Sequence, residues 1–417
     1  MAERTIDWLQ RLGLFLDKFS DCFVRTGHEL SAKKYLSGLL SSSERKNILG
    51  LGQDEHGSAG YQALQHFVSD AAWKAKDVWD RLRKMNAGDR GVLVLDDTGF
   101  RKKGRHSVGV DRQYSGTLEQ VGNCQVAVSS VLLVGPLTFP MGMDLYLPEK
   151  WTESKERRAE VGIPVGLRFQ PKWQIALEQV RTVMEAGVEI ECVVGDAGYG
   201  HGFEFRQSLD ELGLLYVVGI KSDATAFAAG EQRERAPVRD LARRLPEGKW
   251  RALTWREGTK GALREQFAMI QLRQAGAKAA KAGARPITLL CERSSKATRL
   301  KDWKYYFTNI PWGTPMNKVV DLAHSRWAIE QSYQHMKEEL GLDHFEGRGF
   351  AGFHRHVVLT ALSYSFLQLE RQHGKSLLSL PMVRNLVKRF IGMVTILTNK
   401  KLWEEFQQVA RIYPNTS

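Results

Sequence analysis

The chain has 417 residues, enough for roughly two to four structural units and a sizeable core without disulfides or a structural metal. Hydrophobic residues make up 43% of it and charged residues 26%, which excludes global disorder. No apolar run approaches the ~18–20 residues of a membrane helix, the start lacks a secretory signal, and the four scattered cysteines form no Cys-x-x-Cys motif. The scattered cysteines predict reduced thiols in a cytoplasmic protein. Lys and Arg number 60 against 47 Asp and Glu, and the net charge of +13 predicts a polyanionic partner, most often nucleic acid.

The first 88 residues are predicted to form an N-terminal helical, DNA-binding domain. Apolar residues recur there at helical spacing in two stripes. Such stripes form the core of a helical bundle, and we interpret them so. The stripes are Trp8, Leu9, Leu12, Phe15, Leu16, Phe19 and Phe23, and then Leu64, Phe67, Val68, Ala71, Val78 and Leu82.

Residues 89–220 change to a pattern of buried strands. Three strands joined by short linkers predict antiparallel pairing, and the helix–strand–helix–strand order that follows predicts parallel pairs with right-handed crossovers. This order predicts an α/β domain of the ribonuclease-H-like class, a mixed five-stranded sheet with flanking helices. The strands are expected at 91–95, 106–115, 124–135, 190–195 and 214–220, and the helices at 171–187 and 203–212.

Residues 221–303 interrupt this core as a basic, β-rich insertion. Between residues 231 and 304 there are 19 Lys and Arg against 8 Asp and Glu, so most of the excess charge lies here. Strands are expected at 250–255, 266–272 and 287–292, with an exposed hairpin tip at 274–285.

The core is expected to resume at 304–345 and to be followed by a helical C-terminal region at 346–417. A strand at 303–309 leads into one long helix at 315–340, which begins near a proline and ends before Gly341. A helix at 353–370 and a basic helical tail complete the chain.

Acidic residues stand where catalytic groups lie in open α/β folds. Asp96 and Asp97 end the first strand, Asp196 ends the fourth, and Glu330 lies in the long helix. Single acids after strands often cap turns, so each has a structural alternative. Because the first and fourth strands are neighbours in the expected fold, a functional cluster is favoured.

One face of the long helix carries Arg326, Glu330, Gln334 and Lys337, spaced four, four and three residues apart. A solvated charged face is the alternative. Phosphodiester chemistry explains an Arg, an acid and a Lys directed together, because carboxylates bind divalent cations and the basic groups hold phosphates.

These residues resemble the Tyr-x2-Arg-x3-Glu-x6-Lys signature of bacterial insertion-sequence DDE transposases. The segments 93–99, 113–125, 145–148, 193–200 and 325–337 look like that family's, and the resemblance runs from about residue 64 to residue 371. One departure is plain, because Ala323 stands at the signature's Tyr position.

The resemblance implies a catalytic, metal-binding triad of Asp97, Asp196 and Glu330. It also implies two Mg²⁺ ions, for which Mn²⁺ substitutes, double-stranded DNA as transposon ends and target, and a nucleoid-associated dimer or higher assembly on DNA. Asp97 is preferred to Asp96 because the family pairs Asp with Thr; strand alternation does not decide between them.

Further basic residues are candidates for DNA contacts, beside Arg326 and Lys337. A cluster next to the first acids could hold phosphates or be a solvated hairpin tip, and exposed arginines in the insertion could follow the DNA backbone. The candidates are Arg101, Lys102, Lys103, Arg105, Arg243, Arg244 and Arg251.

Aromatic and histidine residues have mainly structural interpretations. Trp250, Trp255, Trp303 and Trp312 are expected mostly in the core, although one could stack on an extruded base. A metal site at His344, His354 and His356 is rejected, because no Cys partners exist and helix histidines are usually surface or core residues.

Three functions compete. The leading one is a transposase that binds terminal repeats, cleaves them with Mg²⁺ and joins the 3′ ends to target DNA. The others are a catalytically silent end-binding regulator and a nuclease of the same fold that only hydrolyses. The intact triad argues against the regulator, and the helix stripe with the basic insertion argues against simple hydrolysis.

Overall fold

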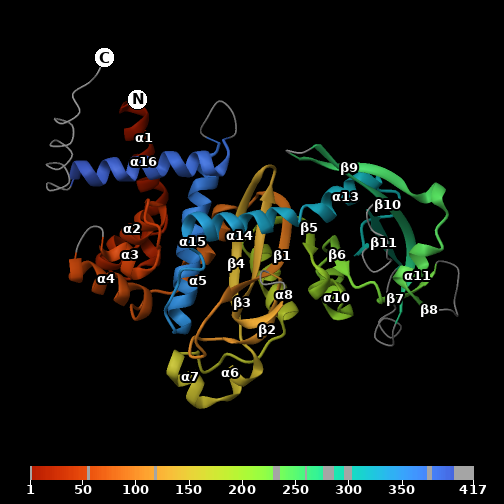
Figure 1. Cartoon of the computed structure of the whole chain (residues 1–417), viewed down its shortest axis with the longest axis horizontal. Coiled ribbons are helices and arrows are strands. Elements are labelled where there is room, and N and C mark those ends of the chain that lie inside the picture. The colour runs from red at the N-terminus through yellow and green to blue at the C-terminus, as the bar shows by residue number, and fades with distance from the viewer. Residues whose placement is uncertain are drawn as a thin grey trace.

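The computed structural model places the helices of the N-terminal region at one end, a mixed sheet in the middle and the insertion strands at the other end (Figure 1). It describes residues 2–53, 57–116, 120–228, 235–258, 261–275, 286–294, 303–372 and 378–398.

The N-terminal region forms helices, as predicted, and both apolar stripes contribute to one hydrophobic core. Phe19, Phe67 and Val68 are fully buried, and α15 packs against α2, α4 and α5. The N-terminal helices are therefore fixed to the helix that follows the Glu330 segment. The bounds are α1 (Ala2–Asp17), α2 (Thr26–Leu40), α3 (Ile48–Gln53), α4 (Gly57–Ser69), α5 (Ala75–Met85) and α15 (Phe350–Glu370).

The central sheet has the pairing order β4–β3–β1–β5–β6. The pairs β4–β3 and β3–β1 are antiparallel, and β1–β5 and β5–β6 are parallel. This mixed α/β arrangement is compatible with the expected class, and the predicted first and fourth strands are neighbours. The strands are β1 (Arg90–Arg101), β2 (Asp111–Ser115), β3 (Gln120–Val134), β4 (Leu137–Tyr146), β5 (Glu189–Gly195) and β6 (Tyr216–Ile220), and the connecting helices are α6 (Glu149–Glu153), α7 (Lys155–Val161), α8 (Lys172–Glu185), α9 (Ala197–Gly200) and α10 (Phe203–Glu211).

The second and third core strands differ from the prediction. Only residues 111–115 of the expected strand 106–115 are extended, in the short strand β2 that pairs with the start of β3. The third antiparallel core strand is β4, which the sequence analysis did not identify. Its residues are nearly all buried, so its side chains show none of the polar alternation that marks a half-exposed strand.

Strand β1 divides two apolar cores. Val92 and Val94 point into the core shared with α14 and α15, whereas Leu93 and Leu95 point into the core shared with α8 and α10. Alternation therefore carries successive residues of β1 to opposite faces of the sheet.

The predicted helix 315–340 is two helices, α13 (Met316–His324) and α14 (Trp327–Leu340). The Ser325 hydroxyl and amide both donate to the Leu322 carbonyl, and the Ile329 amide donates to the Arg326 carbonyl, three residues back. The Ser325 amide keeps its α-helical bond to the Asp321 carbonyl at 2.9 Å, and the Ala328 amide donates three residues back to the Ser325 carbonyl, so the tighter pattern begins after Ser325. Helix α14 then crosses β1, β3 and β4 and ends at Gly341, whose φ is +66° (Figure 1).

The insertion strands continue the same sheet. Strand β12 pairs with β6 on one side and β11 on the other, and β10 follows β11. Most of the predicted hairpin tip 274–285 lies outside the described residues. The elements are β7 (Thr225–Ala228), β8 (Arg235–Pro237), α11 (Val238–Arg243), β9 (Arg251–Gly258), β10 (Gly261–Gln274), β11 (Pro286–Arg293) and β12 (Lys304–Thr308).

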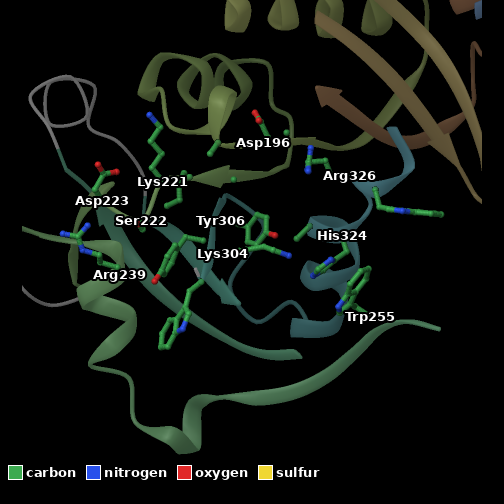
Figure 2. Close-up of a pocket in the computed structure, with 18 of the residues that line it drawn as sticks. Asp196, Lys221, Ser222, Asp223, Arg239, Trp255, Lys304, Tyr306, His324 and Arg326 are labelled. Carbon is green, nitrogen blue, oxygen red and sulfur yellow. The ribbon is translucent and has the colours of Figure 1, made fainter. Parts of the chain in front are cut away.

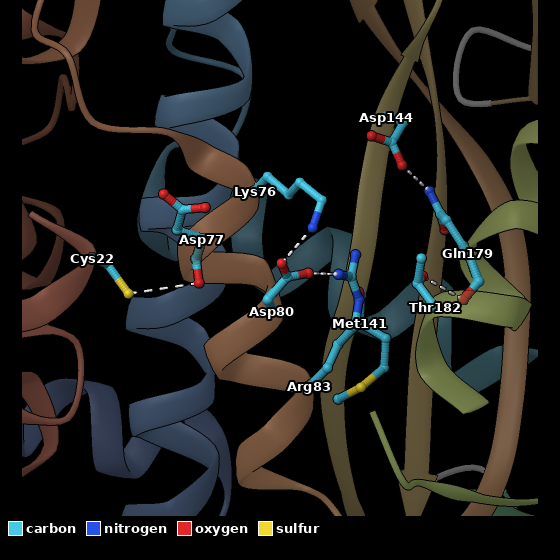
Figure 3. Close-up of polar contacts among 9 residues, drawn as sticks. All are labelled: Cys22, Lys76, Asp77, Asp80, Arg83, Met141, Asp144, Gln179 and Thr182. Carbon is cyan, nitrogen blue, oxygen red and sulfur yellow. Dashed lines mark hydrogen bonds and ion pairs between the residues drawn. The ribbon is translucent and has the colours of Figure 1, made fainter. Parts of the chain in front are cut away.

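Two buried polar side chains fix helices to β4 (Figure 3). Arg83 of α5 donates from Nε to the Met141 carbonyl at 2.7 Å, with Asp80 2.8 Å from its other nitrogen. Gln179 of α8 donates to Asp144 at 2.7 Å and to the Val128 carbonyl at 3.0 Å. Helix α8 is thus held to both β3 and β4.

The C-terminal helix α16 (Leu380–Thr398) has Val383 and Val387 buried and Met382 and Leu386 exposed. It contacts α2 and α15, and residues after 398 lie outside the described part of the chain. No described helix is long and apolar enough to cross a membrane.

Candidate active site

Asp196 is positioned by backbone packing between α9 and β6. It follows β5 directly and caps α9, accepting a hydrogen bond from the Gly198 amide at 2.8 Å. A Cβ on Gly200 would lie 2.2 Å from the Gly219 carbonyl oxygen, so α9 approaches β6 only because both positions are glycine. Asp196 therefore has a capping role and also points into a pocket.

Asp96 and Asp97 lie on opposite faces of β1. Asp96 accepts from Arg326 at 2.8 Å, on the side of α14. Asp97 accepts from Lys172 at 2.8 Å, on the side of α8. Both acids lie inside β1, which continues to Arg101, so the prediction that they end the strand is wrong; both are bound by cations.

The helix stripe is brought to the same place. Arg326 also forms an ion pair with Glu330, so its guanidinium bridges Glu330 and Asp96. Lys337 donates to the Thr98 hydroxyl at 2.8 Å and to the Gly99 carbonyl at 3.2 Å. Arg326 and Lys337 thus contact β1, whereas Glu330 and Gln334 are exposed.

One pocket of about 860 Å³ is lined by all of the predicted acids and by both cations of the stripe. Lys172, Lys221 and Tyr114 line it as well. Residues from β1, the start of α9 and α14, far apart in sequence, therefore meet at one concave site.

Burial changes the charge balance of this pocket. Burial raises the pKa of Asp96 to about 7, against the opposing effect of Arg326. Burial and then the charge of Asp97 raise the pKa of Asp196. Burial lowers the pKa of Lys337. Water is thus partly excluded from the site, and burial favours the neutral forms of these groups.

The donor chemistry suits a hard divalent cation, because carboxylate oxygens are the ligands that Mg²⁺ and Mn²⁺ prefer. Asp97, Asp196 and Glu330 would supply these oxygens. Among the described residues, however, no three acidic, His or Cys side chains are grouped closely enough to hold an ion. Arg326 and Lys172 contact the carboxylates instead.

A second pocket of about 640 Å³ adjoins the first and shares Asp196, Arg326 and Glu330 with it. It lies between the central strands and the insertion (Figure 2). The Trp255 ring stacks on His324 with centroids 3.9 Å apart. Its other lining residues include Lys221, Arg239, Trp303, Lys304, Tyr306 and the signature-departing Ala323.

The predicted basic cluster is split between two roles. Lys102 is half-buried and donates to the Phe345 carbonyl at 2.6 Å, so it fixes a loop, whereas Arg101, Lys103 and Arg105 are exposed. In the insertion, Arg243, Arg244 and Arg251 are exposed and are not among the described residues that line either pocket.

The remaining candidates are mainly structural. His356 is buried, its Nδ1 lying 2.7 Å from the Tyr35 hydroxyl. Trp250 packs on Trp303 and Arg293. Trp312 is exposed.

Sequence reasoning missed Lys172, Lys221 and Arg239. Lys172 follows Pro171 at the start of α8, and Arg239 lies in the short α11. Lys172 and Arg239 share no periodic pattern with the acids. Only the packing of α8 and α11 brings these two residues to the pockets.

The chain belongs to the family described as DDE superfamily endonuclease, whose profile matches residues 18–262, more than half of its length. The profile of the transposase DDE domain matches residues 168–366. The chain is similar to a probable transposase for insertion sequence element IS701 from Microchaete diplosiphon, with 30% identity over 198 residues, which are 46% of this chain and 49% of the relative. The match thus spans about half the length of that curated relative. The resemblance to insertion-sequence DDE transposases is confirmed.

Proposed function

We propose that this protein is a DDE transposase that binds the ends of an insertion sequence, cleaves DNA there and transfers the 3′ ends to target DNA. The observation that carries the proposal is the single pocket that Asp97, Asp196, Glu330, Arg326 and Lys337 line together. Family membership and the ribonuclease-H-like strand order support it.

In this proposal Asp97, Asp196 and Glu330 hold two Mg²⁺ ions, for which Mn²⁺ substitutes. Bound metal supplies activation of the attacking oxygen and stabilisation of the leaving oxygen. Lys337, anchored on β1, faces the phosphate beside the cleaved bond. Arg326 orients Glu330 and stays close enough to contact a phosphate.

The DNA path extends over the insertion. Arg243, Arg244 and Arg251 present exposed charge, as do Arg101, Lys103 and Arg105 beside β1. The second pocket, with aromatic rings and cations next to the carboxylates, suits a base or sugar of the strand being cut. Two ends joined to one target require at least two subunits on DNA.

The test is single-turnover cleavage of a duplex that carries the inverted repeats flanking the gene. Wild-type protein should cleave at the repeat end with Mg²⁺ and not in excess chelator. Glu330→Gln should lower cleavage at least about a hundredfold, because several kcal/mol of metal-dependent stabilisation are removed. Glu338→Gln is the matched control: Glu338 lies two turns along α14, accepts from Gln334 and does not line the pocket.

Product analysis separates the competing functions. Joined 3′ ends support a transposase, and cleaved but unjoined ends identify a hydrolytic nuclease. Tight end binding by wild-type protein with no cleavage at any Mg²⁺ or Mn²⁺ concentration would identify a silent regulator and refute the proposal.

A further inference from the structure

Lys172 and Lys221 line the pocket without a role in the catalytic scheme, and Lys172 is the one that forms an ion pair with a proposed metal ligand. Its Nζ lies 2.8 Å from Asp97 Oδ2, and the side chains are 31% and 21% exposed. Water and ions therefore reach this ion pair, unlike a fully buried one.

The backbone of Lys172 is fixed while its side chain is not. Pro171 caps α8, and Gln179, two turns along, binds both Asp144 and the Val128 carbonyl. The apolar face of α8 shares a core with Leu93 and Leu95 of β1. The ammonium group lies 5.6 Å from the Tyr146 ring centre. The flexible stem of Lys172 can thus leave Asp97 and return without movement of the helix.

Each carboxylate of the pocket already has a partner. Arg326 bridges Asp96 and Glu330, the Gly198 amide donates to Asp196, and Lys172 binds Asp97. Without Lys172, the negative charge of Asp97 would face Asp196 with no direct counter-charge. That these two acids sense each other follows from the contribution of Asp97 to the raised pKa of Asp196.

We propose that Lys172 supplies the counter-charge of Asp97 before metal binds and competes with the divalent cation for this carboxylate. The inference rests on the proposed function, because it takes Asp97 as a metal ligand. A lysine ammonium contributes one positive charge and hydrogen bonds, whereas a divalent cation contributes two charges and direct coordination. Lys172 would therefore have to leave Asp97 for metal to bind there, and this competition would lower the affinity of the site for metal.

The test is titration of the DNA-free protein with Mn²⁺, followed by electron paramagnetic resonance. Lys172→Met, which keeps the length of the side chain and removes its charge, should bind Mn²⁺ about tenfold more tightly, given a unit charge removed near the ion at solvent-exposed dielectric. Lys172→Arg should stay close to wild type. Lys150→Met is the matched control, because Lys150 pairs with Asp111 at 2.5 Å and does not line the pocket.

If Lys172 had only a structural role, Lys172→Met should bind Mn²⁺ less tightly than wild type, because a disordered Asp97 would bind metal less tightly. Unchanged or weaker Mn²⁺ binding by Lys172→Met, with a wild-type unfolding temperature, would overturn the inference. If that variant does not fold, the neutral and polar Lys172→Gln provides the same comparison.

Asp97→Asn separates this inference from the proposed function. Mn²⁺ binding that survives Asp97→Asn would refute both the metal assignment and the inference. Binding that requires Asp97 but ignores the charge at Lys172 would refute the inference alone and leave the proposed function standing.

Discussion

Asp96 and Asp97 differ in partner although they are adjacent in β1. Asp96 is buried beside Arg326 of α14, and Asp97 is bound to Lys172 of α8. Both acids sense Asp196: the charge of Asp97 raises the pKa of Asp196, and the charge of Asp196 raises the pKa of Asp96. Asp97 therefore stays the proposed ligand on the basis of the family resemblance, and the contact with Arg326 gives Asp96 the proposed role of orienting that guanidinium.

We therefore expect Asp97→Asn to abolish both cleavage and Mn²⁺ binding. Asp96→Asn should retain Mn²⁺ binding and slow cleavage about tenfold, because it weakens one charge-assisted hydrogen bond. Parallel cleavage and metal-binding assays of the two variants measure this. The reverse pattern would shift the first ligand by one residue.

The sequence could not choose between these two acids because both faces of β1 are buried. The two faces of β1 are distinguished only by the helices that cover them. Leu93 and Leu95 lie in the core with α8, and Val92 and Val94 lie in the core with α14 and α15. The spacing of the α14 stripe, by contrast, predicted a shared face without any knowledge of packing. Lys172 could not be found from spacing, since nothing in the sequence says that α8 begins beside Asp97.

At the scale of elements, strand and helix types were largely predictable and their ends were less so. Buried runs such as 91–95 and 190–195 predicted β1 and β5, while the uniformly buried β4 lacked any alternating signal. The break between α13 and α14 depends on local hydrogen bonds of Ser325 that compete with the helix. Apolar periodicity continues across that break, which explains the prediction of one helix.

His356 of α15 links three elements and makes stability depend on pH. Its Nδ1 lies 2.7 Å from the Tyr35 hydroxyl of α2, and its Nε2 lies 3.1 Å from the Gly341 carbonyl that ends α14. Burial lowers the pKa of His356 to about 4. The folded protein thus keeps a neutral His356 at pH values where an unfolded chain, with a pKa of about 6.5, is protonated.

The free energy of unfolding should therefore fall by up to about 3 kcal/mol as pH decreases from about 6.5 to about 4, and this contribution should be complete above pH 6.5. Urea unfolding between pH 4 and pH 7 measures it. His356→Gln should reduce the slope. His28, His335 and His354, whose pKa values burial also lowers, contribute to the slope that remains. An exposed control, His106→Gln, should leave the slope unchanged; an equal slope in His356→Gln would contradict the assignment.

At the scale of the whole molecule, one continuous sheet connects the catalytic pocket to the basic insertion. Strand β12 bridges β6 and β11, so DNA that follows the insertion strands approaches the edge where Asp196 lies. The uneven charge along the sequence indicated such a surface, but the continuity of the sheet could not be predicted, because it depends on pairing between strands about 85 residues apart in sequence. The second pocket lies at this junction, between the central strands and the insertion.

If the insertion follows the DNA backbone, replacing Arg243, Arg244 and Arg251 together by Gln should weaken end binding. The slope of log K against log salt should fall by about two to three, close to one unit for each phosphate that the variant no longer neutralises. Gel-shift or anisotropy titrations from 50 to 300 mM salt, a range of about sixfold, give this slope. The same number of exposed cations outside both pockets, Lys84, Arg90 and Arg181, provides a control of equal net charge. The control should lower affinity slightly, because long-range attraction depends on total charge. It should leave the slope close to that of the wild type, because counterion release depends on direct binding to phosphates. Equal slopes for both triple variants would mean that the insertion arginines are a solvated surface and that the DNA path lies elsewhere on the sheet.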